Sequence, residues 1–321
     1  MQEWPTVEND QNLFDGKISF PTRSGYHVTI RAVWQDNLPS GSKVGTVFAI
    51  HGSPGSHNDF KYITYHLKNT GIRMISINMP GHGYTQNHKK ISFHNDDRNA
   101  FIQAMIDHLN VDRDVVFVGH SRGSENALNI CTLNQNRAKG LLLINTSGFR
   151  RHKGIKPFFI IRFASWIYNL KPLAPLARII MHPILYHIYN RLVKLKTQSG
   201  KIAAVCVQSM KTFALSDQRS YVKELNTQSK FPILLAYSGK DFLIEEEIVR
   251  EMLTEFEDSE ELIIDDSQAT DTETKAARWF RCRLSQKRTL GVCFHQDGHY
   301  LQKYKAKFLS DAIQAIFEYK D

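Results

Sequence analysis

The sequence predicts an α/β fold: a mostly parallel, doubly wound sheet with a helical segment inserted between two of its strands. Two observations predict the sheet, namely short apolar runs bounded by turn residues and the helical patterns that alternate with them. A third predicts the insertion, because this alternation is interrupted once, at 146–229, by a basic, aromatic stretch without strands. With 321 residues, 42% hydrophobic and 23% charged, the chain has the composition of an ordinary globular protein.

The first half of the chain supplies most of the predicted sheet. YHVTIRAVW at 26–34 alternates apolar and polar residues, which is typical of a half-buried antiparallel strand. Helical patterns follow at 58–69 and at 97–110, the latter with apolar residues spaced by three and four. Around them lie four continuous apolar runs that indicate parallel strands buried on both faces, VGTVFAI, RMISINM, DVVFVG and GLLLIN, at 44–50, 73–79, 114–119 and 140–145.

The insertion at 146–229 predicts a helical cap over the carboxyl edge of the sheet. The sheet domain is then expected to comprise 1–145 and 230–321. The insertion carries 14 Lys and Arg against two acidic residues, Asp217 and Glu224, in a chain whose net charge is only +9. No nucleic-acid-binding motif accompanies these cations, so nucleic acid is not an expected partner.

Beyond the insertion the alternation resumes, with a strand at 231–239, a helix at 244–257 and a last strand near 290–294. The stretch from 258 to 288 is ambiguous. ELIID (261–265) has the composition of a strand and TDTETKAARWFRCRL (270–284) that of a helix, but the sequence places neither in the sheet.

Cysteine usage and the N-terminal residues predict a cytoplasmic protein. The four cysteines lie far apart and form no CxxC or Cys/His ligand pattern, which indicates reduced thiols and no structural zinc. The first 16 residues are polar and acidic, unlike a secretory signal. Because no stretch reaches 18 uncharged apolar residues, a membrane-spanning helix is not expected.

The pentapeptide GHSRG, at 119–123, is the strongest catalytic signal. It follows a buried strand and opens a helix, the setting in which G-x-S-x-G forms a nucleophile elbow. Gly119 and Gly123 must be small so that strand and helix approach closely, and the tight turn lifts the hydroxyl of Ser121 above the sheet. The alternative is an ordinary strand-to-helix turn.

A serine hydroxyl needs a base to become a nucleophile, and in this architecture the order is serine, acid, histidine. Asp241 follows the strand ILLAYSGK, and His299 lies between the last predicted strand and the C-terminal helix. Both positions lie at the sheet edge where open α/β proteins bind ligands. Taken singly, Asp241 has an alternative role as the N-cap of the next helix, and His299 as an ordinary loop histidine.

A second loop, HGSPG at 51–55, predicts an oxyanion site. It follows the strand VGTVFAI and turns at Gly52, which places the backbone N–H groups of Ser53 and Arg122 as the expected donors. His51 and His120 beside these elements are interpreted as packing and hydrogen-bonding residues.

Two further side chains near these turns have open or non-catalytic roles. A polar role for His82, in the turn MPGHGYT, is possible but not required. The side chain of Arg122 is expected to point away from the substrate and to pair with Glu125, three residues on.

With these residues assembled, the chain resembles the α/β-hydrolase superfamily. HGSPG, PGHG, GHSRG, the SGKD acid turn and the DGHY histidine turn occur in register over 25–150 and 231–321. HGSPGSHNDF and GHSRGSENAL are most similar to a group of uncharacterised hydrolase-like proteins from nematodes.

The resemblance implies that Ser121 is the nucleophile, His299 the base and then the acid, and Asp241 the partner that orients the histidine. The serine separates the chain from epoxide hydrolases and haloalkane dehalogenases, whose nucleophile is an aspartate. One departure is Ser124, where many members have a second glycine.

The expected function is cofactor-free and metal-free hydrolysis of an ester, thioester or related acyl bond in a small, apolar substrate, through an acyl-enzyme. Apolar cap residues either contact the substrate's tail or form the cap's own core: Phe158, Phe159, Trp166, Ile179, Ile180 and Tyr186. The alternative is a non-catalytic ligand-binding or interaction protein on the same fold. The basic cap is either a solvated face or a peripheral contact with an anionic membrane.

Overall fold

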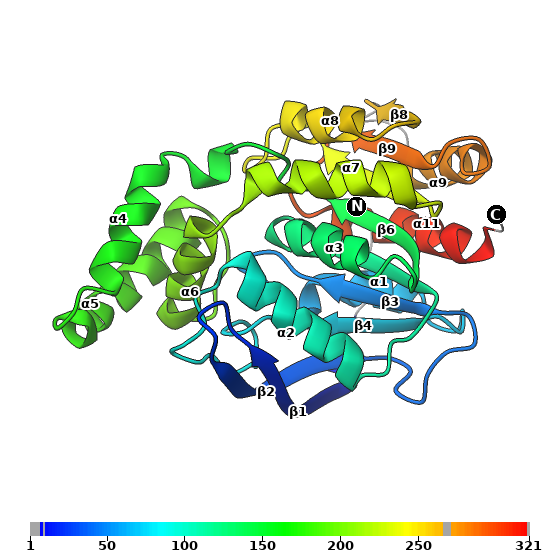
Figure 1. The fold of residues 1–321 in the computed structure, drawn as a ribbon. Coiled ribbons are helices and arrows are strands. Elements are labelled where there is room, and N and C mark those ends of the chain that lie inside the picture. The colour runs from blue at the N-terminus through cyan, green and yellow to red at the C-terminus, as the bar shows by residue number, and fades with distance from the viewer. Residues whose placement is uncertain (1–6, 9, 266–270, 320–321) are drawn as a thin grey trace.

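The computed structural model describes residues 7–8, 10–265 and 271–319, so the first and last few residues of the expected sheet domain lie outside the described residues. Nine strands form one sheet in the order β1-β2-β4-β3-β5-β6-β7-β9-β8 (Figure 1). β2 is antiparallel to both of its neighbours, and every other adjacent pair is parallel. The strands are β1 Leu13–Pro21, β2 His27–Asp36, β3 Thr46–Ile50, β4 Arg73–Ile77, β5 Val115–His120, β6 Ala138–Ile144, β7 Ile233–Ser238, β8 Ser259–Ile264 and β9 Thr289–Phe294.

Helices cover both faces of the sheet, as the apolar runs predicted. In β3, Phe48 and Ile50 belong to one apolar cluster and Val47 and Ala49 to the other, because successive strand residues point to opposite faces. The first cluster is covered by α2 Asn95–His108, α3 Arg122–Leu133, α7 Gln218–Gln228 and α8 Glu246–Glu255. The second is covered by α1 Lys61–His66, α9 Thr272–Arg283, α10 Leu301–Tyr304 and α11 Ala306–Glu318.

The edges of the sheet differ from the sequence expectation. β1 was not predicted, because its sequence lacks a continuous apolar run. It is an edge strand that pairs with β2 and buries only Ile18 and Phe20. The ambiguous stretch supplies β8, which lies parallel to β9 at the opposite edge, and α9, which packs against β8 and β9.

The inserted segment divides between two layers. α4 Phe158–Tyr168, α5 Ala174–His187 and α6 Gly200–Lys211 form a lobe that projects from one end of the sheet (Figure 1). α7 instead packs on α3 and α8 in the layer over the sheet, with Val222 and Leu225 fully buried. Within the lobe, α4 and α5 both pack on α6, which is the innermost of the three helices.

Three of the four cysteines are buried. The thiols of Cys131, Cys206 and Cys293 are buried, that of Cys282 is exposed, and none is in a disulfide. In the part of the chain that the structure describes, no helix combines the length and apolarity needed to cross a bilayer.

Candidate active site

Ser121 occupies a strained turn between β5 and α3. Its backbone has φ 52° and ψ −121°, a conformation that non-glycine residues rarely adopt and that marks functional sites. The Ser121 carbonyl accepts from the Ser124 N–H at 3.0 Å and from the Ser124 hydroxyl at 2.6 Å. Ser124 therefore stabilises the elbow by a hydrogen bond that a second glycine could not make.

The glycines of the elbow are required by close backbone contacts. A Cβ on Gly123 would lie 2.3 Å from the carbonyl oxygen of Ile50, and one on Gly119 would lie 2.6 Å from the Cα of Ser124. Gly52 meets the elbow from the other side, since a Cβ there would lie 3.1 Å from the Cβ of Ser121. The predicted elbow and the predicted oxyanion loop are therefore in direct contact.

The structure brings the predicted acid and histidine together. The Nδ1 of His299 lies 2.7 Å from Oδ2 of Asp241, and both side chains are buried. The other oxygen of Asp241 accepts from the backbone N–H groups of Leu243 and Ile244 at 2.8 and 3.1 Å. Burial by itself raises the pKa of Asp241, but the His299 ring and these N–H donors outweigh burial and lower the pKa overall. An ionised Asp241 fixes the His299 tautomer that carries its proton on Nδ1.

The histidine turn is anchored by residues from three strands. The His299 carbonyl accepts from Nε2 of His120 at 3.0 Å and from the side-chain amide of Asn145 at 2.8 Å, while the Ser238 hydroxyl donates to the Gly298 carbonyl. Burial, and then the nearby His299, lowers the pKa of His120 to about 3, so this residue is a neutral donor. Asn145 and Ser238 were not predicted; the only sequence signal was their place at strand ends.

The Ser121 hydroxyl lies at the same sheet edge as His299. Its neighbour His120 packs against His299 with ring centroids 4.9 Å apart. Among the described residues, the Ser121 hydroxyl forms no hydrogen bond with His299. The acid and the histidine are thus hydrogen-bonded to each other, whereas the serine and the histidine are not.

The oxyanion loop is held by two buried histidines. His51 donates from Nδ1 to the Gly52 carbonyl at 2.6 Å and accepts the Met79 N–H on Nε2 at 3.0 Å, the structural role expected for it. The Ser53 hydroxyl lies 3.2 Å from Nε2 of His82, whose Nδ1 lies 3.3 Å from the Pro80 carbonyl. Burial, and then Arg98, lowers the pKa of His82 to about 3, so neutral His82 accepts from the Ser53 hydroxyl.

Two backbone N–H groups remain available at this edge. Within the described residues, neither the N–H of Ser53 nor that of Arg122 donates to a protein acceptor. Arg122 is the first residue of α3, where N–H groups have no intrahelical partner and the helix dipole favours negative charge. The two groups have the chemistry of an oxyanion site.

Residues 10–318 match the sequence model of a family described as "Alpha/beta hydrolase of unknown function (DUF1057)". The chain belongs to this α/β-hydrolase family. It is similar to "Uncharacterized protein F35H12.5" of Caenorhabditis elegans, with 33% identity over 298 residues that cover 90% of this chain and 82% of that protein.

Solved structures show the same fold. An esterase from Thermogutta terrifontis has a TM-score of 0.62 at 14% identity, covering 94% of this chain and 97% of its own. The haloalkane dehalogenase DbeA from Bradyrhizobium elkani has a TM-score of 0.64 at 14% identity, covering 95% and 98%. The expected α/β-hydrolase fold and the resemblance that predicted it are both confirmed.

The Arg122 side chain pairs with Glu125, as predicted, and turns away from the candidate site. Its guanidinium is fully buried, forms an ion pair with Glu125, donates to Asn95 at 2.8 Å and stacks on the ring of Phe213 at 4.3 Å. The other Glu125 oxygen accepts the backbone N–H of Ala214, which lies in the inserted segment. This polar cluster therefore ties α3 to α2 and to the chain between α6 and α7.

A cavity of about 360 Å³ adjoins the oxyanion loop. Its lining includes residues beside the candidate site, among them Pro54, Gly55 and Tyr300, but neither Ser121 nor His299. The lobe contributes two lysines, Lys194 and Lys196, to its wall. The cavity lies beside the candidate site, while the side chains of Ser121 and His299 are buried.

The inner helix of the lobe contacts the turn beside the oxyanion loop. Cys206 of α6 lies with its Sγ 3.8 Å from Nε2 of His82, and a Cβ on Gly81 would lie 3.0 Å from the side chain of Val205. Burial raises the pKa of the Cys206 thiol to about 12, so the thiol stays protonated. In this conformation α6 closes the region above the oxyanion loop.

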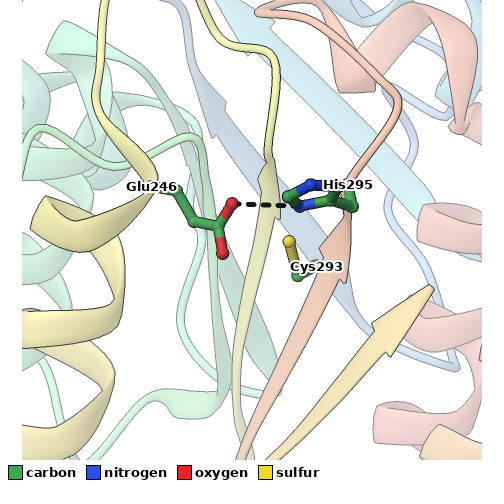
Figure 2. A group of neighbouring side chains, drawn as sticks. All are labelled: Glu246, Cys293 and His295. Carbon is green, nitrogen blue, oxygen red and sulfur yellow. Dashed lines mark ion pairs between the residues drawn. The ribbon is translucent and has the colours of Figure 1, made fainter. Parts of the chain in front are cut away.

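Among the described residues, Glu246, Cys293 and His295 offer donor atoms within 4.8 Å of one another (Figure 2). The donor set is one that zinc uses, but the groups are already engaged: Glu246 pairs with His295 at 3.2 Å and with Arg250 at 2.6 Å. Burial raises the pKa of Cys293 to about 12, and a metal would require its thiolate. His295 packs on the acid turn, where a Cβ on Gly239 would lie 2.5 Å from its Nδ1. The cluster of Glu246, Cys293 and His295 therefore supports the turn that carries Asp241.

The apolar cap residues lie elsewhere than the sequence predicted. They were expected to contact the substrate or to form the cap's core, but five of the six are exposed on the outside of the lobe: Phe159, Trp166, Ile179, Ile180 and Tyr186. The expectation that they form the cap's own core is wrong for these five, and their contact with a substrate stays a prediction. The packing of α4 and α5 on α6 uses other positions, including Ser165, Met181 and Leu185.

Proposed function

We propose that this α/β-hydrolase is a serine hydrolase that cleaves an ester, thioester or related acyl bond without a cofactor or metal. One observation carries the proposal: Ser121 occupies a strained elbow at the sheet edge where His299 is oriented by Asp241. These three residues occur in the order serine, acid, histidine, at the ends of β5, β7 and β9.

In the proposed first step, Ser121 Oγ attacks the acyl carbon while His299 Nε2 takes the hydroxyl proton. Asp241 holds the proton on Nδ1 and stabilises the imidazolium. The oxyanion accepts from the N–H groups of Ser53 and Arg122, and each such donor contributes about 100- to 1,000-fold in rate. His299 then gives its proton to the leaving group, and the acyl group remains on Ser121.

The second step releases the acid. Water attacks the acyl-enzyme, His299 again takes the proton, and the acyl–oxygen bond to Ser121 breaks as His299 returns the proton to the serine. Because the same residues serve both steps, the site needs no further acid or base.

The cavity beside the oxyanion loop favours an amphiphilic substrate. Its wall combines apolar and aromatic groups, such as Pro54, Ile202 and Tyr300, with the ammonium groups of Lys194 and Lys196. We propose an apolar acyl substrate with a polar or anionic part that lies against these lysines.

A second candidate is a non-catalytic binding protein on this fold. Two observations favour it: the Ser121 hydroxyl forms no hydrogen bond with His299 among the described residues, and α6 covers the oxyanion loop. The two candidates differ in whether Ser121 is activated.

A fluorophosphonate probe distinguishes them. Wild-type protein is expected to be labelled covalently and Ser121→Ala is not. The matched control is Ser147→Ala, which removes a neighbouring buried hydroxyl that has no hydrogen-bond partner in the described structure and leaves labelling intact. Folded wild-type protein that is not labelled, or labelling that persists in Ser121→Ala, excludes the serine hydrolase.

A further inference from the structure

The outer face of α4 is apolar and exposed. Phe159, Phe163 and Trp166, spaced by four and three residues, expose 71%, 60% and 56% of their surface. They line a shallow hollow together with Ile160 and Arg162. A surface helix of a globular protein normally directs charged and polar groups outward. α4 directs aromatic rings outward instead.

α5 repeats this arrangement beside α4. Leu176, Ile179 and Ile184 are at least half exposed, while Met181 and Leu185 on the opposite side pack toward α6. Both helices are thus apolar on the inner and on the outer side. A helix that is apolar all round is stable only where something apolar covers it. The joint outer surface of α4 and α5 is called the lobe face below.

The charge around the lobe face has one sign. Residues 146–216 contain 12 Lys and Arg and no Asp or Glu. Arg162 lies within α4, Lys171 in the turn to α5, and Arg191 just beyond α5; these three form no ion pair with any described residue. A surface that is both apolar and uniformly cationic complements a partner that is apolar inside and anionic outside.

We propose that the lobe face docks on an anionic membrane surface. α4 and α5 then lie in the plane of the headgroups, with Phe163, Trp166 and Ile179 at the acyl boundary and the cations among the lipid phosphates and carboxylates. The two helices have 11 and 14 residues, fewer than the roughly 20 needed to cross a bilayer. A second copy of the chain is disfavoured as the occupant, because a symmetric dimer would bring two cationic faces together.

Docking at this face also indicates the class of substrate, an inference that rests on the proposed function. α6 contacts α4 and α5 on one side, and its Cys206 and Val205 contact the oxyanion loop region on the other. A bilayer at the lobe face therefore lies one helix away from the candidate site. The substrate expected there is a lipid ester or thioester with an anionic headgroup.

Vesicle flotation tests the docking directly. Wild-type protein is expected to float with vesicles of phosphatidylcholine and phosphatidylserine, and not with phosphatidylcholine alone. Phe163→Ser and Ile179→Ser each weaken binding about tenfold or more, because each removes a large apolar side chain from the acyl boundary. The matched control is Leu133→Ser at the end of α3, which is 66% exposed but lies in the sheet domain, and it binds like wild type.

Charge variants provide the second arm. Arg162→Gln and Lys171→Gln each weaken binding about fivefold, the equivalent of about 1 kcal/mol per cation near an anionic surface, and added salt weakens wild-type binding. Lys17→Gln, an exposed lysine of β1, is the control without effect. Equal binding by all variants, or binding that ignores phosphatidylserine and salt, overturns the proposal.

Two further measurements separate the competing outcomes. Ser121→Ala floats like wild type if docking is independent of catalysis, so a failed labelling experiment leaves the flotation result intact. Light scattering reports the mass in solution: a dimer that Phe163→Ser and Ile179→Ser convert to monomer would assign the lobe face to a second copy and overturn membrane docking.

Discussion

The candidate site and the lobe face are opposites in how they treat polar and apolar groups. At the carboxyl edge of the sheet, polar side chains are buried and paired, as with Asp241 and His299 or Arg122 and Glu125. On the lobe face, apolar side chains are exposed, as with Phe163 and Ile179. Buried polar groups are retained only when they are partnered, and exposed apolar groups gather in patches mainly where a partner covers them.

The polar groups of the candidate site find their hydrogen-bond partners within the chain, whereas the apolar groups of the lobe face are not covered by it. The hydrogen bonds that orient His299 are all made within the sheet domain. The apolar surface of α4 and α5 is covered on one side only. The sheet edge is therefore preorganised for chemistry, and the lobe for binding to something outside the chain.

Asp241→Asn tests whether the buried pairing serves catalysis. The amide oxygen can still accept from Leu243 and Ile244, but His299 loses the carboxylate that fixes its tautomer and stabilises its charge. We expect turnover of an activated ester to fall about 10⁴-fold with little change in stability. Steady-state kinetics beside urea unfolding measures both quantities; unchanged turnover in the folded variant would contradict the triad.

Arg122→Met tests whether the neighbour of Ser121 is structural. Removing the guanidinium leaves the Glu125 carboxylate buried without its partner, which costs about 3 to 5 kcal/mol of unfolding free energy. Turnover per folded molecule is expected to change little, because only the backbone N–H of residue 122 contacts the oxyanion. Denaturant unfolding and active-site titration provide the two readouts.

The control for this variant is Arg122→Met combined with Glu125→Gln, which recovers part of the lost stability by removing the unpaired charge. A collapse of turnover in fully folded Arg122→Met would instead show that the guanidinium acts in the site.

Asp59→Asn tests a carboxyl group in the wall of the cavity beside the oxyanion loop. Burial raises the pKa of Asp59 to about 7, although a backbone bond from Ser56 opposes the shift. Between about pH 4 and pH 7 the unfolded chain releases this proton while the folded chain keeps it, so the wild type loses stability as pH rises through that window. The loss is on the order of 4 kcal/mol and is constant well above pH 7.

Asp59→Asn is neutral at every pH and removes this slope, so its advantage over wild type is expected to be larger at pH 8 than at pH 4. Urea unfolding at both pH values measures the difference. An identical pH dependence in the two proteins would show that Asp59 ionises normally.

Phe163→Ser is expected to change the unfolding free energy least of these variants. Because the ring is exposed in the free protein, the substitution changes the unfolding free energy by less than about 0.5 kcal/mol. The same change at Phe308, which is fully buried under the sheet, costs about 3 kcal/mol or more. Thermal unfolding of the two variants compares them; a large loss at Phe163 would mean that the lobe face is packed in solution.

Much of the candidate site could be predicted because its residues follow strands that are marked in the sequence by apolar runs. Ser121, Asp241 and His299 each come within five residues of the end of an apolar run, and parallel strands bring their carboxyl ends to one edge. The supports could not be predicted in this way. Asn145 contacts a carbonyl 154 residues away, and His82 approaches Ser53 from another turn, so neither contact has a local signal.

Apolar periodicity, turn chemistry and charge are local properties of the chain, so the fold class, the order of the candidate site residues and the cationic character of the insertion could be predicted from the sequence. It could not determine which side of each lobe helix faces the protein. α4 and α5 are apolar on both sides, so only their packing on α6 decided that Phe163 and Ile179 face outward. The tertiary structure likewise places α7 in the helical layer over the sheet, because Val222 and Leu225 pack there against other buried apolar residues.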